Sequence, residues 1–279
     1  MKKETKNGKI GRGNTDIYGL KYHEMFGLRF FGSNMRCLLS SLKKTKERIW
    51  VVTVNPEFVM EALADARFMD IINKSNVRVI DGIGLIWAKE IQLRIKNYEL
   101  RILKPLMRLW FGLKVGVEIL QGKHRDSLIT GADLMMKIGE EKSKKKIFFL
   151  GGWGDRAERT AEFFDSRNKK LETRFSKGYP EVENEKVLKE INDFRPDYLF
   201  VAYGMRKQEE WIEANWDKLK ARVVVGVGRS FDYYSGDLKR APSFVRKMGL
   251  EWLYSLIKEP KRWKRQLALP KFIWMVMKW

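Results

Sequence analysis

The chain has 279 residues, of which 44% are hydrophobic, which allows a sizeable core and excludes a chain that is disordered throughout. Its formal net charge of +21, from 56 Lys and Arg against 35 Asp and Glu residues, favours a polyanion, an anionic membrane surface or a phosphorylated substrate as partner. The single cysteine, Cys37, excludes a disulfide framework. Because the only histidines are His23 and His124, a Cys- or His-rich metal site is not expected.

The N-terminal residues contain no apolar segment of the kind that a secretory signal needs. Residues 1–16 are polar and basic, so we expect a flexible basic tail ahead of a body that spans residues 17–248. No uninterrupted apolar run reaches the length of a membrane-spanning helix. The composition therefore predicts a protein that stays inside the cell.

Polar residues follow two predicted strands near the start of the body. Residues 49–52 predict a buried strand that ends at Thr53 and Asn55, a helical pattern starts at Glu57, and residues 77–80 predict a strand that leads into Asp81. Ligands bind at the carboxyl ends of strands in open α/β sheets, so these residues are site candidates and Asp81 is the candidate base. The alternative is that Asp81 and Gly82 form an ordinary turn in which the aspartate caps a helix.

Basic and apolar residues alternate irregularly between about residues 91 and 127. Arg94, Arg101, Arg108 and Lys114 are interleaved with Leu, Ile, Trp and Phe residues. This mixture fits a basic amphipathic insertion that lies in a membrane interface. It fits equally well an ordinary helix whose apolar side faces the core and whose lysines are solvated.

A glycine turn follows a clear strand signal in the middle of the chain. Residues 147–150 predict a buried strand, and Gly151 and Gly152 lead from it into a helix, an arrangement that can form a phosphate-binding nest. A tight turn needs glycines for its own backbone, so this signal has two explanations. Further strands are predicted at 198–203 and 223–228. The alternation of strands and helices predicts an α/β fold with a Rossmann-like, mostly parallel sheet and helices on both faces.

Residues 249–279 differ in composition from the body. Tryptophan and basic residues stand beside the short apolar segment 272–277, a pattern that suits the headgroup level of a bilayer and predicts a basic, helical, membrane-facing appendage. The alternative is a C-terminal helix that docks on the body, and both states could occur in turn. Nucleic acid is another polyanion, but the chain contains none of the standard nucleic-acid-binding motifs.

Ten different short motifs occur along the chain in one order. They are Thr53-x-Asn55-x-Glu57, Asp81-Gly82-x-Gly84, Thr130-Gly131-x-Asp133, Leu150-Gly151-Gly152, Gly178-Tyr179, Lys207-Gln208-Glu209, Gly226-Val227-Gly228-x-Ser230-Phe231-Asp232, Arg240-Ala241-Pro242, Gly249-Leu250-Glu251-Trp252-Leu253 and Glu259-Pro260-x-Arg262. This series closely resembles the WecG/TagA/CpsF family of bacterial glycosyltransferases. The resemblance covers about residues 49–90 and 128–266.

The resemblance implies an inverting glycosyltransferase that needs neither a metal ion nor a cofactor. It implies a UDP-sugar donor, with N-acetylmannosamine as the usual sugar, and a polyprenyl-diphosphate-linked sugar acceptor, in the synthesis of cell-surface polysaccharide or teichoic acid. It also implies a peripheral location on the inner face of the cell membrane, and no nucleic-acid partner. Whether the protein forms a homo-oligomer in which apolar faces of the appendage are covered is left open by the sequence.

The resemblance also implies roles for individual residues. Asp81 corresponds to the general base that takes the proton of the acceptor hydroxyl. The other residues correspond to substrate-binding positions: Thr53 and Asn55 beside the base, Gly151 and Gly152 in the glycine turn, Gln208 at the sugar, Tyr179 and Asp232 at the uridine end, Arg240 in its Arg-Ala-Pro motif, and Arg262 and Arg265 at the diphosphate.

The chain departs from the family pattern at five positions. The family usually has arginine where Leu128 and Ser255 stand, Ala-Pro where Met205 and Arg206 stand, and glycine at Arg229. Arg125, Arg206 and Arg229 are candidates to supply replacement charge. These departures allow a rival interpretation, a membrane-associated nucleotide-sugar-binding protein that has lost catalysis.

Overall fold

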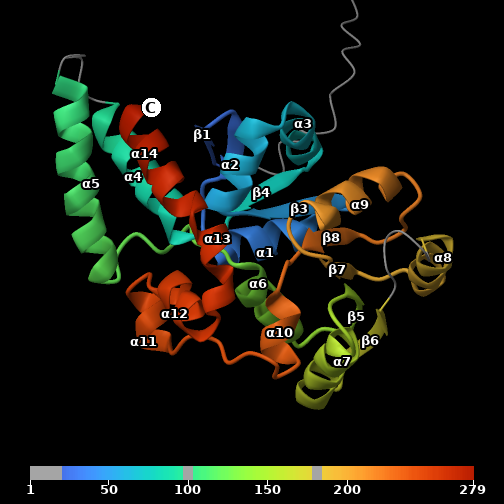
Figure 1. Cartoon of the computed structure of the whole chain (residues 1–279). Coiled ribbons are helices and arrows are strands. Elements are labelled where there is room, and N and C mark those ends of the chain that lie inside the picture. The colour runs from blue at the N-terminus through green and yellow to red at the C-terminus, as the bar shows by residue number, and fades with distance from the viewer. Residues whose placement is uncertain (1–20, 97–102, 178–183) are drawn as a thin grey trace, which may run out of the picture.

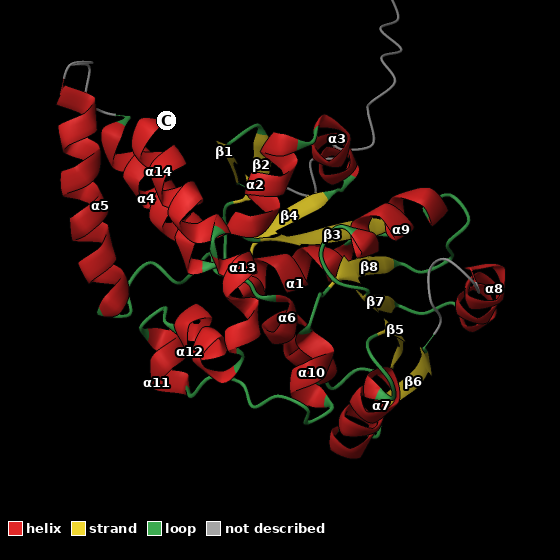
Figure 2. Ribbon diagram, in the orientation of Figure 1, coloured by secondary structure: helices red, strands yellow, loops and turns green. Residues whose placement is uncertain are grey.

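The computed structural model describes residues 21–96, 103–177 and 184–279, and its centre is a parallel sheet (Figures 1 and 2). In these residues six parallel strands form the sheet in the order β4-β3-β8-β7-β5-β6. They are β3 (Ile49–Val54), β4 (Val77–Ile80), β5 (Lys145–Gly151), β6 (Leu171–Ser176), β7 (Tyr198–Ala202) and β8 (Val223–Gly226). The predicted α/β fold with a parallel sheet is confirmed.

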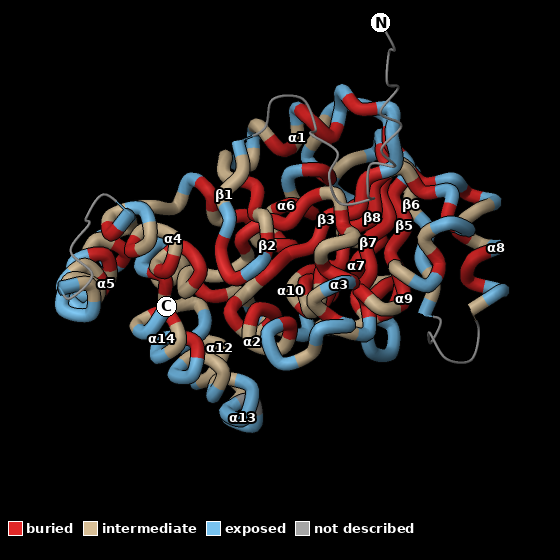
Figure 3. The backbone as a smooth tube through the Cα atoms, turned by 90° about the horizontal axis from the view of Figure 1, so that it is seen from above, coloured by how far each residue is buried: buried red, intermediate tan, exposed pale blue. Residues whose placement is uncertain are grey.

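The sheet is covered on both faces because its strands are apolar on both sides. Alternate residues of a strand point to opposite faces. Trp50 and Val52 of β3 accordingly belong to one core, while Ile49 and Val51 belong to the other. Figure 3 shows the inner strands β3, β8 and β7 in the colour of buried residues. Runs without polar alternation are typical of parallel strands that helices cover on both sides.

The two cores contain different helices. The first core takes side chains from α2 (Pro56–Ala64), α3 (Ala66–Lys74), α4 (Ile83–Ile95), α8 (Asn184–Phe194) and α9 (Lys207–Asn215). The second takes them from α1 (Met35–Lys44), α6 (Gly131–Gly139), α7 (Arg156–Arg167) and α10 (Ser230–Tyr234).

Two strand features were not predicted from the sequence. An antiparallel hairpin joins β1 (Tyr22–Met25) to β2 (Leu28–Phe31), ahead of α1. The edge strand β6 has the sequence LETRFS, in which only Leu171 is buried. A strand at the edge of a sheet has one free side, so it needs no continuous apolar run and gives a weak sequence signal.

The predicted insertion at 91–127 contains the end of α4 and a second helix, α5 (Lys104–Leu120), which packs against α4. Gly112, Val115 and Ile119 form the buried side of α5, and the indole Nε1 of Trp87 on α4 donates a hydrogen bond to the Gly112 carbonyl at 2.8 Å. The core-facing interpretation therefore holds for one side of this helix. Its opposite side is exposed.

The C-terminal segment folds into short helices that run back over the body: α11 (Ser243–Lys247), α12 (Glu251–Lys258), the 3₁₀ helix η2 (Pro260–Arg262), α13 (Trp263–Gln266) and α14 (Ala268–Lys278). Helix α14 packs against α2, α4 and α5 (Figure 1). It buries Phe272 and Val276. The Phe272 ring meets Phe26 edge-on at a centroid distance of 5.5 Å. The docked state of the appendage is the one present in this structure.

Candidate active site

A cleft of about 290 Å³ opens at the carboxyl ends of β3, β4, β7 and β8. Its floor is formed by residues that directly follow these strands, and α13 and the start of α14 supply Arg265, Ala268 and Leu269 on the appendage side. Of the residues predicted as site candidates, Thr53, Asn55, Asp81, Gln208, Arg240 and Arg265 line this cleft. Parallel strands bring their carboxyl ends to one edge, which explains why residues distant in sequence meet there.

Thr53 and Asn55 are held in place by the backbone around the end of β3. The Thr53 hydroxyl is buried and donates to the Gly226 carbonyl of the neighbouring strand β8 at 2.9 Å. The Asn55 side-chain oxygen accepts from the Phe58 amide at 3.1 Å and so caps α2. Both side chains are therefore fixed before any ligand arrives, which suits residues that orient a substrate.

Asp81 directly follows β4, and its amide donates to the Val54 carbonyl at 2.7 Å. Its carboxylate accepts a hydrogen bond from the Gly131 amide, with Oδ2 and N 3.3 Å apart. Burial at the strand ends raises the pKa of Asp81 to about 7, although the Gly131 hydrogen bond opposes the shift. Asp81 and Gly82 form the turn from β4 into α4, as the alternative expected, but Asp81 does not cap α4, because Gly82 is its N-cap and α4 has no side-chain cap. The carboxylate instead accepts from Gly131, the first residue of α6.

Arg240 is tied into the wall of the cleft beside Asp81. Its guanidinium donates to both carboxylate oxygens of Asp133, at 2.6 and 2.9 Å, and to Thr130 and Glu251, each at 3.2 Å. A guanidinium with these partners holds α6 and α12 together. These contacts give Arg240 a structural role that does not depend on a bound substrate.

Gln208 is buried, and both ends of its carboxamide are engaged. Its oxygen accepts from the Gly228 amide at 2.9 Å, and its Nε2 donates to Glu209 at 2.8 Å. Glu209 is fully buried and also accepts from the Arg206 amide at 3.1 Å. Burial raises the pKa of Glu209 to about 8. Glu209 is a positioning residue that sequence reasoning missed, although the Lys207-Gln208-Glu209 motif contains it.

The appendage places charged groups at the mouth of the cleft. Arg265 lines the cleft, and its guanidinium binds both carboxylate oxygens of Glu57 on α2. Arg262 lies on η2, between α12 and α13, and its side chain falls outside what the structure describes. Arg229 also lines the cleft and holds Glu259, which immediately precedes η2, through two hydrogen bonds of 2.6 and 3.0 Å.

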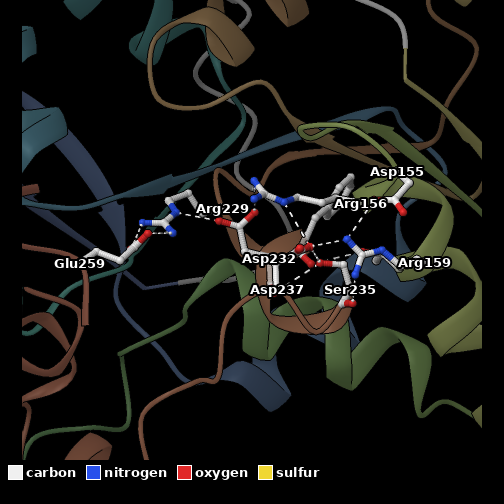
Figure 4. A network of polar contacts seen from close by, with 10 residues as sticks. Asp155, Arg156, Arg159, Arg229, Asp232, Ser235, Asp237 and Glu259 are labelled. Atoms are coloured by element: carbon white, nitrogen blue, oxygen red, sulfur yellow. Dashed lines mark hydrogen bonds and ion pairs between the residues drawn. The ribbon is translucent and has the colours of Figure 1, made fainter. Parts of the chain in front are cut away.

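Asp232 is not brought into the cleft lining. It is buried, and its carboxylate is paired with Arg229 at 2.8 Å and with Arg156 at 3.0 Å (Figure 4). The same figure shows that these pairs belong to one network of ion pairs, which runs from Glu259 on the appendage through Asp237 and Arg159 to Asp155. The contacts of Asp232 therefore hold Arg229 at the cleft rather than reach into it.

The predicted phosphate nest also lies apart from the cleft lining. Gly151 and Gly152 have φ values of 91° and 78°, and a Cβ on Gly151 would lie 2.7 Å from the Tyr203 ring. The left-handed backbone and the close ring explain these glycines without a ligand. Tyr179 lies outside the described residues.

The departures from the family pattern fall into different environments. Of the three candidate replacement arginines, Arg229 lines the cleft, whereas Arg125 and Arg206 do not. Arg206 binds Glu61, Asp65 and Glu210 on the outer side of α2 and α9, and Arg125 donates to the Lys247 carbonyl. Leu128 packs against the first core, and Ser255 lies half-buried on α12.

Known proteins resemble this chain over most of its length. The chain matches the sequence model of the glycosyl transferase WecG/TagA/CpsF family over residues 23–103 and 111–279. It is 28% identical over 260 residues to proteins of Staphylococcus aureus strains MRSA252 and MW2, and each alignment covers 91% of this chain and 92% of the relative. Both relatives are named N-acetylglucosaminyldiphosphoundecaprenol N-acetyl-β-D-mannosaminyltransferase. The chain belongs to the WecG/TagA/CpsF family of glycosyltransferases.

Proposed function

We propose that this protein transfers N-acetylmannosamine, or a closely similar sugar, from a UDP-sugar to N-acetylglucosaminyl-diphospho-undecaprenol or a related polyprenyl-diphosphate-linked sugar. The transfer inverts the anomeric centre and serves the assembly of a cell-wall polymer. The names of the relatives support the sugar and the lipid acceptor. The single observation that carries the reaction type is the Asp81 carboxylate, whose pKa is raised to about 7 by burial at the edge of the cleft.

In the proposed reaction Asp81 is the general base. The acceptor hydroxyl oxygen attacks the anomeric carbon of the donor, the bond from that carbon to the UDP oxygen breaks, and the hydroxyl proton passes to Asp81. A base with a pKa near the working pH is both deprotonated often enough and basic enough to accept this proton. Attack from the side opposite the leaving UDP inverts the anomeric centre. Thr53, Asn55 and Gln208, which line the cleft, would orient the sugars.

The departing UDP carries negative charge that must be stabilised. Arg265 and Arg229 line the cleft and can offer guanidinium groups to a diphosphate. Arg262 is proposed as a third from its place on η2, directly before α13. Because arginine guanidinium groups can stabilise the charge of the leaving diphosphate, we propose a reaction that needs no metal ion. The uridine end of the donor is proposed to lie toward Ser230 and Tyr233, next to Asp232, and Tyr179 is kept as a proposed contact.

The proposed acceptor is anchored in lipid, so the protein is proposed to work at the inner face of the cell membrane. The appendage carries exposed Trp252, Ile257, Trp263 and Trp274 together with many lysines and arginines. Such a combination suits the headgroup level of a bilayer. The appendage is thereby proposed to bring the cleft and the lipid-linked acceptor together.

The test is release of UDP from UDP-N-acetylmannosamine, measured with and without a lipid-diphosphate-linked N-acetylglucosamine acceptor and in the presence of EDTA. We expect acceptor-dependent release that EDTA does not abolish and that Asp81→Asn lowers by at least about a thousandfold, since the base is lost. Binding of UDP-sugar without any release would favour the rival, a nucleotide-sugar-binding protein without catalysis. Product stereochemistry, read by NMR, tests the inversion.

A further inference from the structure

The outer face of α5 is an exposed apolar stripe. Leu106, Trp110, Leu113 and Val117 recur at intervals of three or four residues, which places them on one side of a helix. Leu106 is 66% exposed and Trp110 is 64% exposed. We call the following set the α5 stripe: Leu106, Leu109, Trp110, Leu113, Val117 and Leu120.

The stripe is exposed because the opposite side of α5 is the one that packs on the body. Gly112, Val115 and Ile119 are buried. Arg94 on α4 binds Glu118 of α5, and the Arg108 guanidinium donates to the Met277 carbonyl of α14. The helix is thus fixed in orientation, and the stripe cannot turn inward. A helix that is apolar on both sides needs a second covering surface.

The charges around the stripe indicate what covers it. The chain carries a net charge of +21, and exposed Lys114 and Lys123 lie beside or just beyond the stripe. On neighbouring α14, the Lys278 ammonium lies 3.7 Å from the centre of the Trp274 ring, and Trp274 is exposed. A second copy of this chain would bring like charge against like charge. An anionic lipid surface would instead neutralise it and accept the apolar side chains.

We propose that the α5 stripe inserts into the interface of an anionic membrane, with α5 lying along the surface. In the described part of the chain, no helix combines the length and the low charge that crossing a membrane would require. Helix α5 spans 17 residues and is therefore about 26 Å long, so the stripe offers an extended contact. Figures 1 and 3 place α5, α12 and α14 at the same end of the molecule, away from α7 and α8.

Part of the α5 stripe lies outside the match to the family model. The match to the family model omits residues 104–110, which form the first part of α5 and contain half of the stripe. Helix α5 packs on α14, whose Ala268 and Leu269 line the cleft. The role of this contact rests on the proposed function: insertion of α5 would hold the cleft at headgroup level, where the diphosphate of a lipid-linked acceptor lies.

The experiment is flotation of the full chain with vesicles of phosphatidylcholine, alone or with phosphatidylglycerol. The test variant is Leu106→Gln with Trp110→Gln. The matched control is Leu63→Gln with Trp153→Gln, which also removes one exposed leucine and one exposed tryptophan, at 47% and 75% exposure, both outside α5. We expect the wild type to bind anionic vesicles more tightly than neutral ones. The test variant should weaken that binding by about tenfold or more, and the control by less than twofold.

Two further measurements distinguish the possible failures. With a short-chain, water-soluble acceptor the test variant should keep the wild-type kcat/KM, whereas with the acceptor in vesicles its rate should fall. Equal vesicle binding by wild type and test variant overturns the inference and leaves the proposed function untouched. A wild-type oligomer that the test variant dissociates, measured by light scattering without lipid, would assign the stripe to a second copy and also overturn it. Loss of transfer with both acceptors in the wild type would overturn the proposed function alone.

Discussion

Arg265 and Glu57 join the appendage to the body across the mouth of the cleft. The Arg265 Nε and Nη2 atoms lie 2.8 and 2.9 Å from the two carboxylate oxygens of Glu57. Glu57 lies in the first turn of α2, where the helix dipole also favours a negative charge. Because both residues line the cleft, a diphosphate that enters it would compete with Glu57 for the same guanidinium fork.

We therefore expect Arg265→Ala to lower kcat/KM by about 10- to 100-fold, since one charge-assisted contact to the leaving group is lost. The free energy of unfolding should change by less than about 1 kcal/mol, because exposed ion pairs contribute little. Steady-state kinetics and urea denaturation measure the two effects. Lys264→Ala is the matched control, as Lys264 is an exposed cation on the same helix that is not among the cleft-lining residues.

Glu57→Gln gives the complementary result. If Glu57 occupies Arg265 only until substrate arrives, its removal frees the guanidinium and should leave kcat/KM equal to or above that of the wild type. A loss of activity as large as that of Arg265→Ala would show that the ion pair itself is needed, and would contradict competition between Glu57 and the diphosphate.

The ionised Asp81 carboxylate is expected to be needed for activity but to lower the free energy of unfolding. Its pKa is raised to about 7 in the folded protein, whereas a free aspartate titrates near 4, so the folded state binds this proton more tightly than the unfolded state. The contribution of the group to stability is therefore fully present at low pH and is lost as pH rises from about 4 through about 7. Asp81→Asn carries no such loss, and should be more stable than the wild type at pH 8 by about 1–3 kcal/mol.

Urea denaturation at pH 4 and pH 8 measures this difference, which should shrink at the lower pH. The kcat/KM of the wild type should rise with pH through about 7, because the carboxylate is the active form. Asp126→Asn, at an exposed loop aspartate, is the control and should show neither effect. Wild-type stability that does not fall between pH 4 and 8 relative to Asp81→Asn would refute a raised pKa at this site.

The parts of the fold that follow from local sequence were predictable. Buried parallel strands are apolar runs, and the residues after β3 and β4 could be assigned to one sheet edge from topology alone. Edge strand β6 was missed because its exposed residues give no apolar run. The partners of Arg240 and Asp232 were also missed. The pairs of Asp133 with Arg240 and of Arg156 with Asp232 join residues far apart in sequence, and only tertiary packing decides them.

The docked position of α14 should depend on Phe272. This side chain is fully buried, whereas its neighbour Ile273 is 48% exposed. We expect Phe272→Ala to cost about 3 kcal/mol or more, because it leaves a cavity between α14 and the body, and Ile273→Ala to cost less than about 0.5 kcal/mol. Urea denaturation gives both values, and limited proteolysis reports whether α14 is released. Equal effects of the two substitutions would show that α14 does not depend on this contact.

Gly226 at the end of β8 controls how Gln208 is placed. A Cβ at Gly226 would lie 2.5 Å from Nε2 of Gln208 and 2.5 Å from Oε1 of Glu209, and both side chains are buried. Gly226→Ala should therefore break the Gln208–Glu209 hydrogen bond, lower kcat/KM at least tenfold and cost about 1–3 kcal/mol of stability. Gly116→Ala on α5 is the control, since a Cβ there meets no atom within 4 Å, and it should stabilise the protein by about 0.5–1 kcal/mol. Kinetics and urea denaturation of both variants decide the matter. Wild-type activity in Gly226→Ala would mean that the carboxamide of Gln208 need not be held in this position for transfer.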